Sequence, residues 1–329
     1  MNENNMTFTV AAAQAAPVFL NRQATVEKAC DLIAEAGRKG AQLIVLPEVF
    51  VPGYPDWVWV LPPSNKLLSE LYAELVDNAV TIPDDATDQI CRAAKSAGIH
   101  VVIGVNERNT ESSNASLYNT ILYVDSEGNI IGKHRKMVPT GGERLVWTRG
   151  DGSTLDAYDT PFGKLGGLIC WENYMPLARY AMYSYGVQIY VAPTWDSGEL
   201  WLSTLRHVAK EGGTFVIGCC IAMKISDIPD SYEFKEFYKS DKEWVNVGNS
   251  VIVAPNGKFI AGPSEMKEKI LYAEIDLKQI RASKWILDVA GNYARPDIFK
   301  FTVNRKANVI MQTADSDAKP SPAVEKCDE

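Results

Sequence analysis

The sequence predicts an α/β protein in which mixed sheets are covered by helices. Short apolar runs alternate with amphipathic segments along the chain, and some strands come as hairpins whereas others are separated by helices. No internal repeat or long linker divides the 329 residues, so we expect one domain over residues 1–311. The remaining residues, 312–329, are rich in Asp, Ser, Lys, Pro and Glu, a composition typical of a disordered tail.

The amino-terminal half alternates strand and helix before two hairpins. In the first helix, Val26, Ala29 and Ile33 recur at helical spacing, and Gly37 and Gly40 mark its end. The predicted elements are strands at 7–13, 42–46 and 99–105, helices at 24–38 and 84–97, and hairpins pairing 117–124 with 130–132 and 154–158 with 164–169.

The carboxyl-terminal half continues the same alternation. A polar and aromatic stretch at 225–243 interrupts it, which we interpret as a surface excursion. The predicted elements are a helical segment from after Cys170 to about 185, strands at 187–192 and 214–221 around a helix at 199–212, strands at 247–254 and 269–275, and a helix at about 277–288.

Composition excludes several classes of partner. The formal net charge of −8 and sequence pI near 5.1 argue against nucleic acid or an anionic membrane, since both reward clustered Lys and Arg. No apolar stretch approaches the roughly 20 residues that span a bilayer, and the first residues lack a signal peptide.

Six cysteines without a CxxC pair indicate reduced thiols and a cytoplasmic protein. No residue cluster has metal-ligand spacing and no glycine run has a phosphate- or dinucleotide-binding pattern, so we expect no metal and no cofactor.

One candidate nucleophile stands out. Residues 166–173 read GGLICWEN, an apolar strand that ends in Cys170, with a helical segment carrying Pro176 soon after. A thiol at a strand's carboxyl end lies where α/β sites usually form, and nearby backbone N–H groups favour a thiolate or a developing anion. Cysteines are also among the most buried residues, so a lone cysteine at this position is more often simple packing.

Two further segments carry ionisable candidates. Residues 43–55 read LIVLPEVFVPGYP, which puts Glu48 directly after a buried strand, where desolvation raises a carboxyl pKa toward useful base values. Residues 132–144 read GKHRKMVPTGGER and contain Lys136 and Glu143. Taken alone, Glu48 could equally cap the strand or pair with an arginine, and Lys136 could belong to a solvated loop.

Together the three segments resemble the motifs of the nitrilase superfamily, and more narrowly of its nitrilase branch. They stand in the family's order, 88 and 34 residues apart, and the resemblance covers about residues 7–305. It implies a four-layer α-β-β-α sandwich and a catalytic set of Glu48, Lys136 and Cys170, with Glu143 as a supporting acid. It also implies a homodimer or a larger spiral homo-oligomer.

The resemblance implies hydrolysis of a small-molecule nitrile to the carboxylic acid and ammonia through a covalent thioimidate and thioester on Cys170. Candidate substrate contacts lie in or beside the motif loops. They are Tyr54, Trp171, Thr194 and Trp195, with Trp57 and Trp59 as further aromatic candidates. An amidase or carbamoylase with the same triad, a cyanide-degrading enzyme, partial hydration to the amide, and a non-catalytic scaffold stay open as alternatives.

Overall fold

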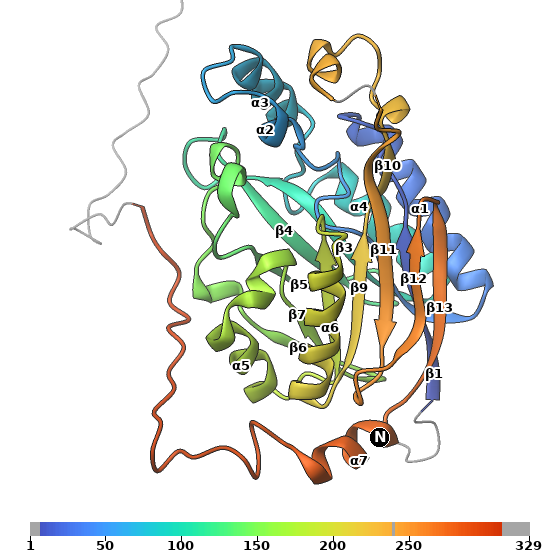
Figure 1. Ribbon diagram of the computed structural model, residues 1–329, viewed down its shortest axis with the longest axis vertical. Helices are drawn as coiled ribbons and strands as arrows, with labels where there is room; N and C mark the ends of the chain where they lie inside the picture. Colours follow the sequence, from blue (N-terminus) through green and yellow to red (C-terminus); the bar gives the residue numbers. More distant parts are fainter. Residues whose placement is uncertain (1–6, 239–240, 311–329) are drawn as a thin grey trace, which may run out of the picture.

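The computed structural model describes residues 7–238 and 241–310. Its ribbon contains two sheets that lie face to face with helices on their outer sides (Figure 1). The predicted disordered tail at 312–329 lies outside the described residues. Among the described residues, no helix has the length and apolar character that crossing a membrane requires.

The first sheet has six strands in the order β13-β1-β2-β3-β4-β5. Strands β1, β2 and β3 run parallel, and β4, β5 and β13 each pair antiparallel with their neighbours. The bounds are β1 (Thr7–Gln14), β2 (Ala41–Val45), β3 (His100–Arg108), β4 (Leu117–Val124), β5 (Ile130–Arg135) and β13 (Lys269–Asp276).

The second sheet places parallel strands β7, β8 and β9 between antiparallel ones, in the order β10-β11-β9-β8-β7-β6 with β12 paired to β11. The bounds are β6 (Ala157–Thr160), β7 (Gly163–Gly167), β8 (Ile189–Thr194), β9 (Phe215–Cys220), β10 (Ala222–Lys224), β11 (Trp244–Val253) and β12 (Phe259–Glu265).

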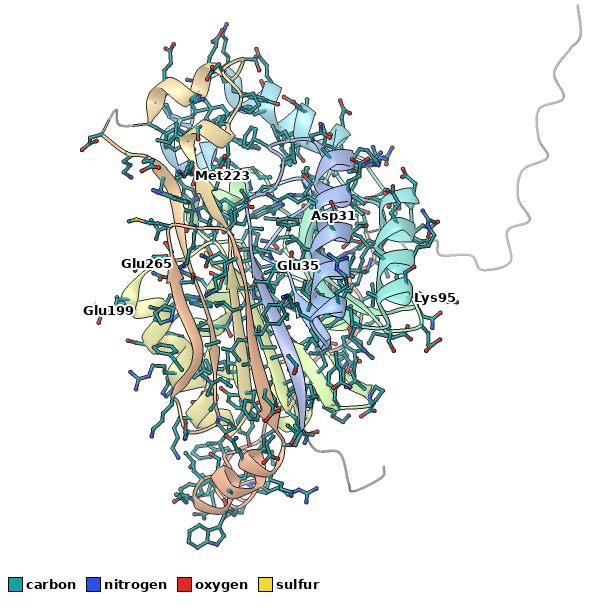
Figure 2. The ribbon with its side chains drawn as sticks, turned by 90° about the vertical axis from the view of Figure 1, so that its right-hand side faces the viewer. Asp31, Glu35, Lys95, Glu199, Met223 and Glu265 are labelled. Atoms are coloured by element: carbon teal, nitrogen blue, oxygen red, sulfur yellow. The ribbon has the colours of Figure 1, made fainter. Side chains whose placement is uncertain are left out.

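Helices cover the outer face of each sheet. Helices α1 (Arg22–Arg38) and α4 (Asp85–Ala97) pack on the first sheet, and α5 (Pro176–Ser184) and α6 (Glu199–Gly212) pack on the second. Figure 2 views these layers edge-on, with α1 and α4 on one side of the sheets and Glu199 at the start of α6 on the other. The predicted α/β class and four-layer α-β-β-α sandwich are confirmed.

Local sequence explains where the outer helices begin and end. Helix α1 begins after Asn21, whose side chain accepts a hydrogen bond from the backbone of Ala24. Helix α4 begins after Asp84, which forms a reciprocal capping box with Thr87, and ends at Gly98 in a left-handed conformation. These caps satisfy backbone groups that the helix itself leaves unpaired.

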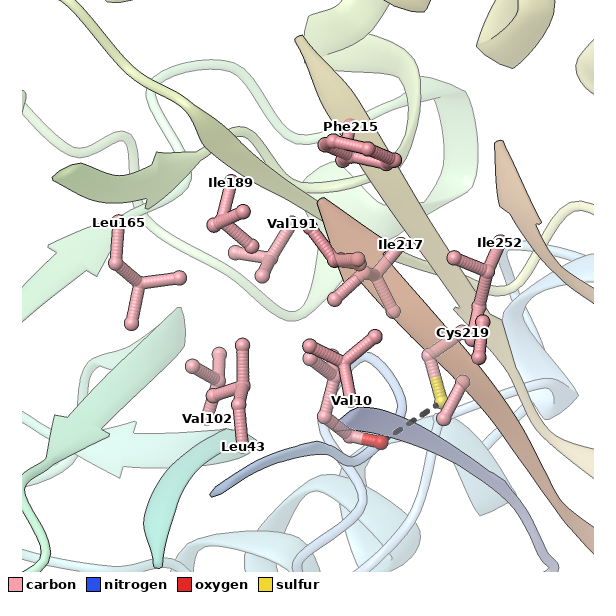
Figure 3. Packing of buried hydrophobic residues seen from close by; sticks show 14 of the residues in the cluster. Val10, Leu43, Val102, Leu165, Ile189, Val191, Phe215, Ile217, Cys219 and Ile252 are labelled. Atoms are coloured by element: carbon pink, nitrogen blue, oxygen red, sulfur yellow. Dashed lines mark hydrogen bonds between the residues drawn. The ribbon is translucent and has the colours of Figure 1, made fainter. Parts of the chain in front are cut away.

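The core between the sheets is built from the inward-facing side chains of both (Figure 3). Val10, Leu43 and Val102 of the first sheet lie opposite residues of the second such as Val191 and Ile217, and all five are fully buried. Burying an aliphatic side chain of this kind contributes about 1.5–3 kcal/mol. This layer holds the two sheets together and so fixes how their strand ends face one another.

Several segments differ from the sequence-based expectation. Helices α2 (Trp57–Val60) and α3 (Leu67–Asp77) and the strands β10 and β12 were not predicted, and β12 is mostly exposed and pairs with β11. Strand β6 covers only the end of the predicted strand 154–158, because residues 152–154 form a single 3₁₀ turn capped by Asp151. The last helix, α7 (Lys278–Ile286), lies within its predicted range.

The stretch 225–243 is more than a surface excursion. It contains 3₁₀ turns at Ile225–Asp227 and Glu233–Phe237, and it packs an aromatic side chain inward. Phe234 is buried and contacts Phe19 and Trp57 edge-on or tilted. The prediction missed this packing because the buried aromatic residue is surrounded in sequence by charged ones.

Candidate active site

The candidate residues follow strand ends that meet at one end of the sandwich. Glu48 lies three residues after β2, Lys136 directly follows β5, and Cys170 lies three residues after β7. Thr194 is the last residue of β8. Since these strands belong to two facing sheets, only their packing brings the four side chains together.

Lys136 lies at the centre of the site and is completely buried. Its Nζ donates to Glu48 Oε1 at 2.8 Å and to Glu143 Oε2 at 2.8 Å. Burial alone would lower the pKa of Lys136, but the negative charges of its neighbours raise that pKa well above its ordinary value. Lys136 is therefore a permanent ammonium that two carboxylates hold in place.

Only one of the two carboxylate oxygens of Glu48 accepts hydrogen bonds from the residues that the structure describes. Oε1 accepts from Lys136 Nζ and, at 2.7 Å, from Asn119 Nδ2. Oε2 is buried and has no hydrogen-bond partner among the residues that the structure describes. Burial raises the pKa of Glu48, although Lys136 and Asn119 oppose that shift. A buried carboxylate with one free oxygen and a raised pKa has the properties of a proton acceptor.

The loop that carries Glu48 packs directly on β3. The backbone of Gly104 donates to Pro47 O at 3.1 Å, and Val51 donates back to Gly104 O at 3.2 Å. A Cβ at position 104 would collide with the backbone of Pro47 and Val49, so only glycine permits this contact. The contact fixes the position of the Glu48 loop relative to the end of β3.

Cys170 lies in a sharp turn between β7 and a 3₁₀ turn at Cys170–Tyr174. Its backbone φ is +51°, a left-handed conformation that costs a non-glycine residue free energy and is typical of functional turns. Burial, and next the charge of Glu48, raise the pKa of the thiol well above its ordinary value, while Lys136 lowers it. The resting cysteine is therefore a protonated thiol that needs a base before it can attack.

Glu143 is held by contacts on both of its oxygens. Oε2 accepts from Lys136 and, at 2.7 Å, from the backbone of Thr140, and Oε1 accepts from Tyr54 Oη at 2.8 Å. The Tyr54 ring stacks in parallel on Trp195 with centroids 4.3 Å apart. Glu143 therefore connects the buried ammonium to the aromatic wall of the site.

Glu172 links the lysine segment to the cysteine segment. Its Oε1 accepts from the backbone of Met137 at 2.7 Å and its Oε2 from the backbone of Ile169 at 2.8 Å. His134 Nε2 lies 3.0 Å from Oε2, and both side chains are buried. Burial opposes ionisation, but His134 and the two backbone donors lower the pKa of Glu172 below its usual value. Because the donors adjoin Lys136 and Cys170, this carboxylate fixes the ammonium relative to the sulfur.

Replacing Glu172 with glutamine tests this link. Glutamine has one acceptor oxygen where three donors converge, so its NH₂ group would face another N–H. We expect Glu172→Gln to lose about 1–3 kcal/mol of unfolding free energy, the cost of leaving a buried donor without an acceptor, and to lower turnover as well. Urea denaturation measures the loss, with the exposed turn residue Glu127 changed to glutamine as the control. Equal stability of the two variants would contradict the role of Glu172.

A cavity of about 920 Å³ opens above the sulfur. Cys170, Glu143 and Glu172 line it, as do four aromatic residues and the partly buried Asp56. Burial, opposed by the hydrogen bond from Tyr238, raises the pKa of Asp56 to about 6. The aromatic residues are Tyr54, Trp59, Trp171 and Trp195. The cavity is large enough for an organic molecule of moderate size.

The predicted site residues separate into those that the structure brings together and those that it does not. Glu48, Lys136 and Glu143 are joined by ion pairs, and their charges act on Cys170. Of the predicted substrate contacts, Tyr54, Trp171 and Trp195 line the cavity. Thr194 instead contacts the sulfur, and Trp57 is fully buried in a neighbouring apolar cluster.

Sequence reasoning missed Asn119, and it assigned no role to Glu172 or Asp56. Asn119 had a usable signal, since it is a polar residue in the middle of the apolar strand 117–124. A buried polar side chain in such a strand needs a partner. Glu172 and Asp56 had no local signal, because their partners are distant in the sequence.

Comparisons with known proteins agree with this geometry. Residues 9–284 match the model of a family described as carbon-nitrogen hydrolase. An aliphatic nitrilase from Sinorhizobium fredii is 41% identical over 312 residues, covering 93% of this chain and 98% of that protein. A bifunctional nitrilase/nitrile hydratase from Nicotiana tabacum is 39% identical over 332 residues, covering 98% of this chain and 94% of that protein.

Solved structures share the fold. A Saccharomyces cerevisiae member of branch 10 of the nitrilase superfamily superposes with a TM-score of 0.70 at 22% identity, covering 87% of this chain and 96% of that chain. A carbon-nitrogen hydrolase from Helicobacter pylori gives a TM-score of 0.68 at 23% identity, covering 89% and 97%. At such identities the likeness concerns the arrangement of sheets and helices.

Proposed function

The chain belongs to the carbon–nitrogen hydrolase family, and from that premise we propose that it is a nitrilase with Cys170 as nucleophile, Glu48 as general base and Lys136 as cationic partner. The products are the carboxylic acid and ammonia. The observation that carries the proposal is the free Oε2 of Glu48 beside a buried, protonated thiol and a fixed ammonium. The nitrilases that match over more than nine-tenths of both chains support the choice of substrate.

The first step activates the thiol. Glu48 Oε2 takes the proton from Cys170 Sγ as the sulfur attacks the nitrile carbon, and the raised pKa of Glu48 favours accepting it. The nitrile nitrogen gains electron density as the carbon–sulfur bond forms, and Glu48 passes the proton that it took from sulfur to that nitrogen, which completes the thioimidate and leaves Glu48 ionised for the next step. General base action of this kind contributes about 10²–10⁴ in rate.

Two additions of water follow, and the same catalytic groups act in both. Water adds to the thioimidate with Glu48 as base, the tetrahedral intermediate releases ammonia, and a thioester remains on Cys170. A second water releases the carboxylic acid and returns the thiol. Lys136 and the backbone N–H that follows Cys170 stabilise the charge of these intermediates, and one such donor is typically worth about 10²–10³ in rate.

The cavity favours an organic nitrile over cyanide. Its four aromatic side chains and volume of about 920 Å³ offer apolar surface that only a substrate with a carbon chain or ring would use. The nitrile group of the substrate lies beside Cys170, and the organic part of the substrate packs against Trp59, Trp171 and Trp195.

Ammonia release from matched substrates tests the proposal. We expect the protein to release ammonia from an aliphatic or arylaliphatic nitrile at a kcat/KM at least about tenfold above that for the corresponding amide, a difference of about 1.4 kcal/mol in transition-state binding. Product analysis identifies the carboxylic acid. Ammonia release from the amide alone would identify an amidase or carbamoylase instead, and release from neither, with the fold intact, would support a non-catalytic scaffold.

A second product has support from the relatives. The Nicotiana tabacum proteins are named bifunctional nitrilase/nitrile hydratases, so the tetrahedral intermediate of this chain could also expel the thiolate and release the amide. The acid-to-amide ratio in the same assay measures how the intermediate divides between loss of ammonia and loss of sulfur.

The assembly state is part of the same proposal. We infer a homodimer or a larger spiral homo-oligomer, and large apolar side chains exposed on α5 and α6, such as Leu177 and Leu200, support subunit contacts there. Sizing chromatography with light scattering gives the number of subunits.

A further inference from the structure

Thr194 contacts the sulfur of Cys170 rather than the space that a substrate would fill. Its hydroxyl oxygen lies 3.1 Å from Cys170 Sγ, and its side chain is fully buried. Cys170 lines the cavity, whereas Thr194 is not among the lining residues. The hydroxyl therefore approaches the sulfur from the protein side, behind the face that a nitrile would meet.

The Thr194 hydroxyl has one neighbour on each side of its oxygen. The backbone N–H of Asp196 donates to Thr194 Oγ1 at 2.9 Å, which occupies one of the two lone pairs of the hydroxyl. The hydroxyl in turn donates its single proton to Cys170 Sγ. Sulfur is thus the acceptor, and the thiol's own proton is left free to go to Glu48.

The turn after Thr194 is rigid. Asp196 Oδ1 accepts from the backbone of Gly198 at 2.8 Å, and Asp196 Oδ2 accepts from Trp171 Nε1 at 2.8 Å. The same aspartate thus connects the Thr194 turn to the residue that follows Cys170. The hydroxyl is therefore aimed at the sulfur before any substrate binds, which avoids the cost of orienting it during the reaction.

We propose that Thr194 is a catalytic residue whose hydroxyl stabilises the thiolate of Cys170, both when the thiolate forms and when it leaves the tetrahedral intermediate of the last hydrolysis. In each step the proton lost by sulfur goes to Glu48, or returns from it, and Thr194 keeps its own proton. A hydrogen bond to charged sulfur is stronger than one to a neutral thiol or thioester sulfur. The bond therefore favours the charged stages, in line with its lowering effect on the pKa of Cys170.

The inference rests on the proposed role of Cys170 as nucleophile, but its test needs no nitrile. Wild type, Thr194→Val and Thr194→Ser are treated with iodoacetamide across neutral to alkaline pH, and peptide mass spectrometry follows the alkylation of Cys170. The half-buried Cys30 gives an internal reference in the same samples. Valine keeps the shape of threonine without the donor, and serine keeps the donor.

We expect Thr194→Val to alkylate Cys170 about 10-fold or more slowly at neutral pH, the effect of losing a hydrogen bond to a charged group, with its pH profile moved upward. Thr194→Ser should remain within about 3-fold of wild type because its hydroxyl is retained, and Cys30 should react equally in all three. Unchanged alkylation of Cys170 in Thr194→Val would overturn the proposal. So would an equal loss in the serine variant, which would assign the effect to packing of the methyl group.

Two further results keep the test decisive. If Thr194→Val fails to fold, Thr194→Ala provides a second variant without the hydroxyl, and the same comparison with serine applies. Slow alkylation in the valine variant together with no nitrile hydrolysis by wild type would support the role of Thr194 at the sulfur while rejecting the nitrilase proposal. The two conclusions therefore fail separately.

Discussion

Replacing Cys170 with alanine is expected to abolish nitrile hydrolysis while leaving the protein folded. The variant lacks the atom that forms the covalent intermediate, so turnover should fall by about 10⁴-fold or more. The fold should persist because alanine keeps the Cβ and the left-handed backbone of position 170, and the removed sulfur makes no ion pair. Ammonia release measures turnover, and thermal unfolding with circular dichroism measures the fold.

Cys91 gives the matched control for this variant. It is a half-buried cysteine on α4, on the outer face of the first sheet and away from the cavity. Cys91→Ala should retain wild-type turnover. Substantial hydrolysis by Cys170→Ala, measured beside that control, would rule out the covalent mechanism.

Replacing Lys136 with methionine is expected to affect both activity and stability. Methionine fills a similar volume but leaves the buried carboxylates of Glu48 and Glu143 without their shared cation. The unfolding free energy should fall by about 3–5 kcal/mol. Turnover should fall by about 10³-fold or more, because the variant loses a donor to the intermediates and Glu48 becomes protonated.

The stability loss in Lys136→Met should grow with pH. Without the ammonium, the largest influence opposing burial is lost, so the folded-state pKa of Glu48 lies further above the unfolded value of about 4.3. The folded state then binds more protons than the unfolded state, so stability falls as pH rises from that unfolded value through the raised folded one. Urea denaturation of wild type and variant at several pH values measures the difference.

Lys133 is the control for Lys136, since it lies in the same basic run but its own side chain is partly exposed. Its ion pair is with Glu107, which Arg135 also binds through two guanidinium contacts. Lys133→Met should therefore cost less than about 1 kcal/mol and keep turnover. A Lys136→Met protein that matched this control in activity would remove Lys136 from the mechanism.

The sequence made the main elements and the three central site residues predictable for a local reason. Helix α4 and strand β3 follow from side-chain periodicity and a capping aspartate, both of which involve neighbours in the chain. Glu48 and Cys170 are recognisable because each follows an apolar strand within a long motif, whereas Lys136 is recognisable only through its motif. Strand β12 was missed because it is held by pairing with β11 and by a contact from Gln14, which is distant in the sequence.

The residues that contact and orient the catalytic set were not predictable from local sequence pattern. Glu172 is two residues from Cys170 in the sequence, yet its function depends on the backbone of Met137, 35 residues away. Thr194 was predicted to touch the substrate, but its neighbour is the sulfur of Cys170, 24 residues earlier. Periodicity carries no information about which atoms meet across such separations.

The sequence by itself determined which groups we propose to act: one thiol, two acids and one ammonium, all within three motif segments. Only the tertiary structure decided their state and direction. Packing two sheets face to face buries Lys136 completely, leaves Glu48 Oε2 without a hydrogen-bond partner in the part of the chain that the structure describes, and aims the Thr194 hydroxyl at the sulfur. Burial and hydrogen-bond direction set the pKa and reactivity of such groups, and both arise only when distant segments are in contact.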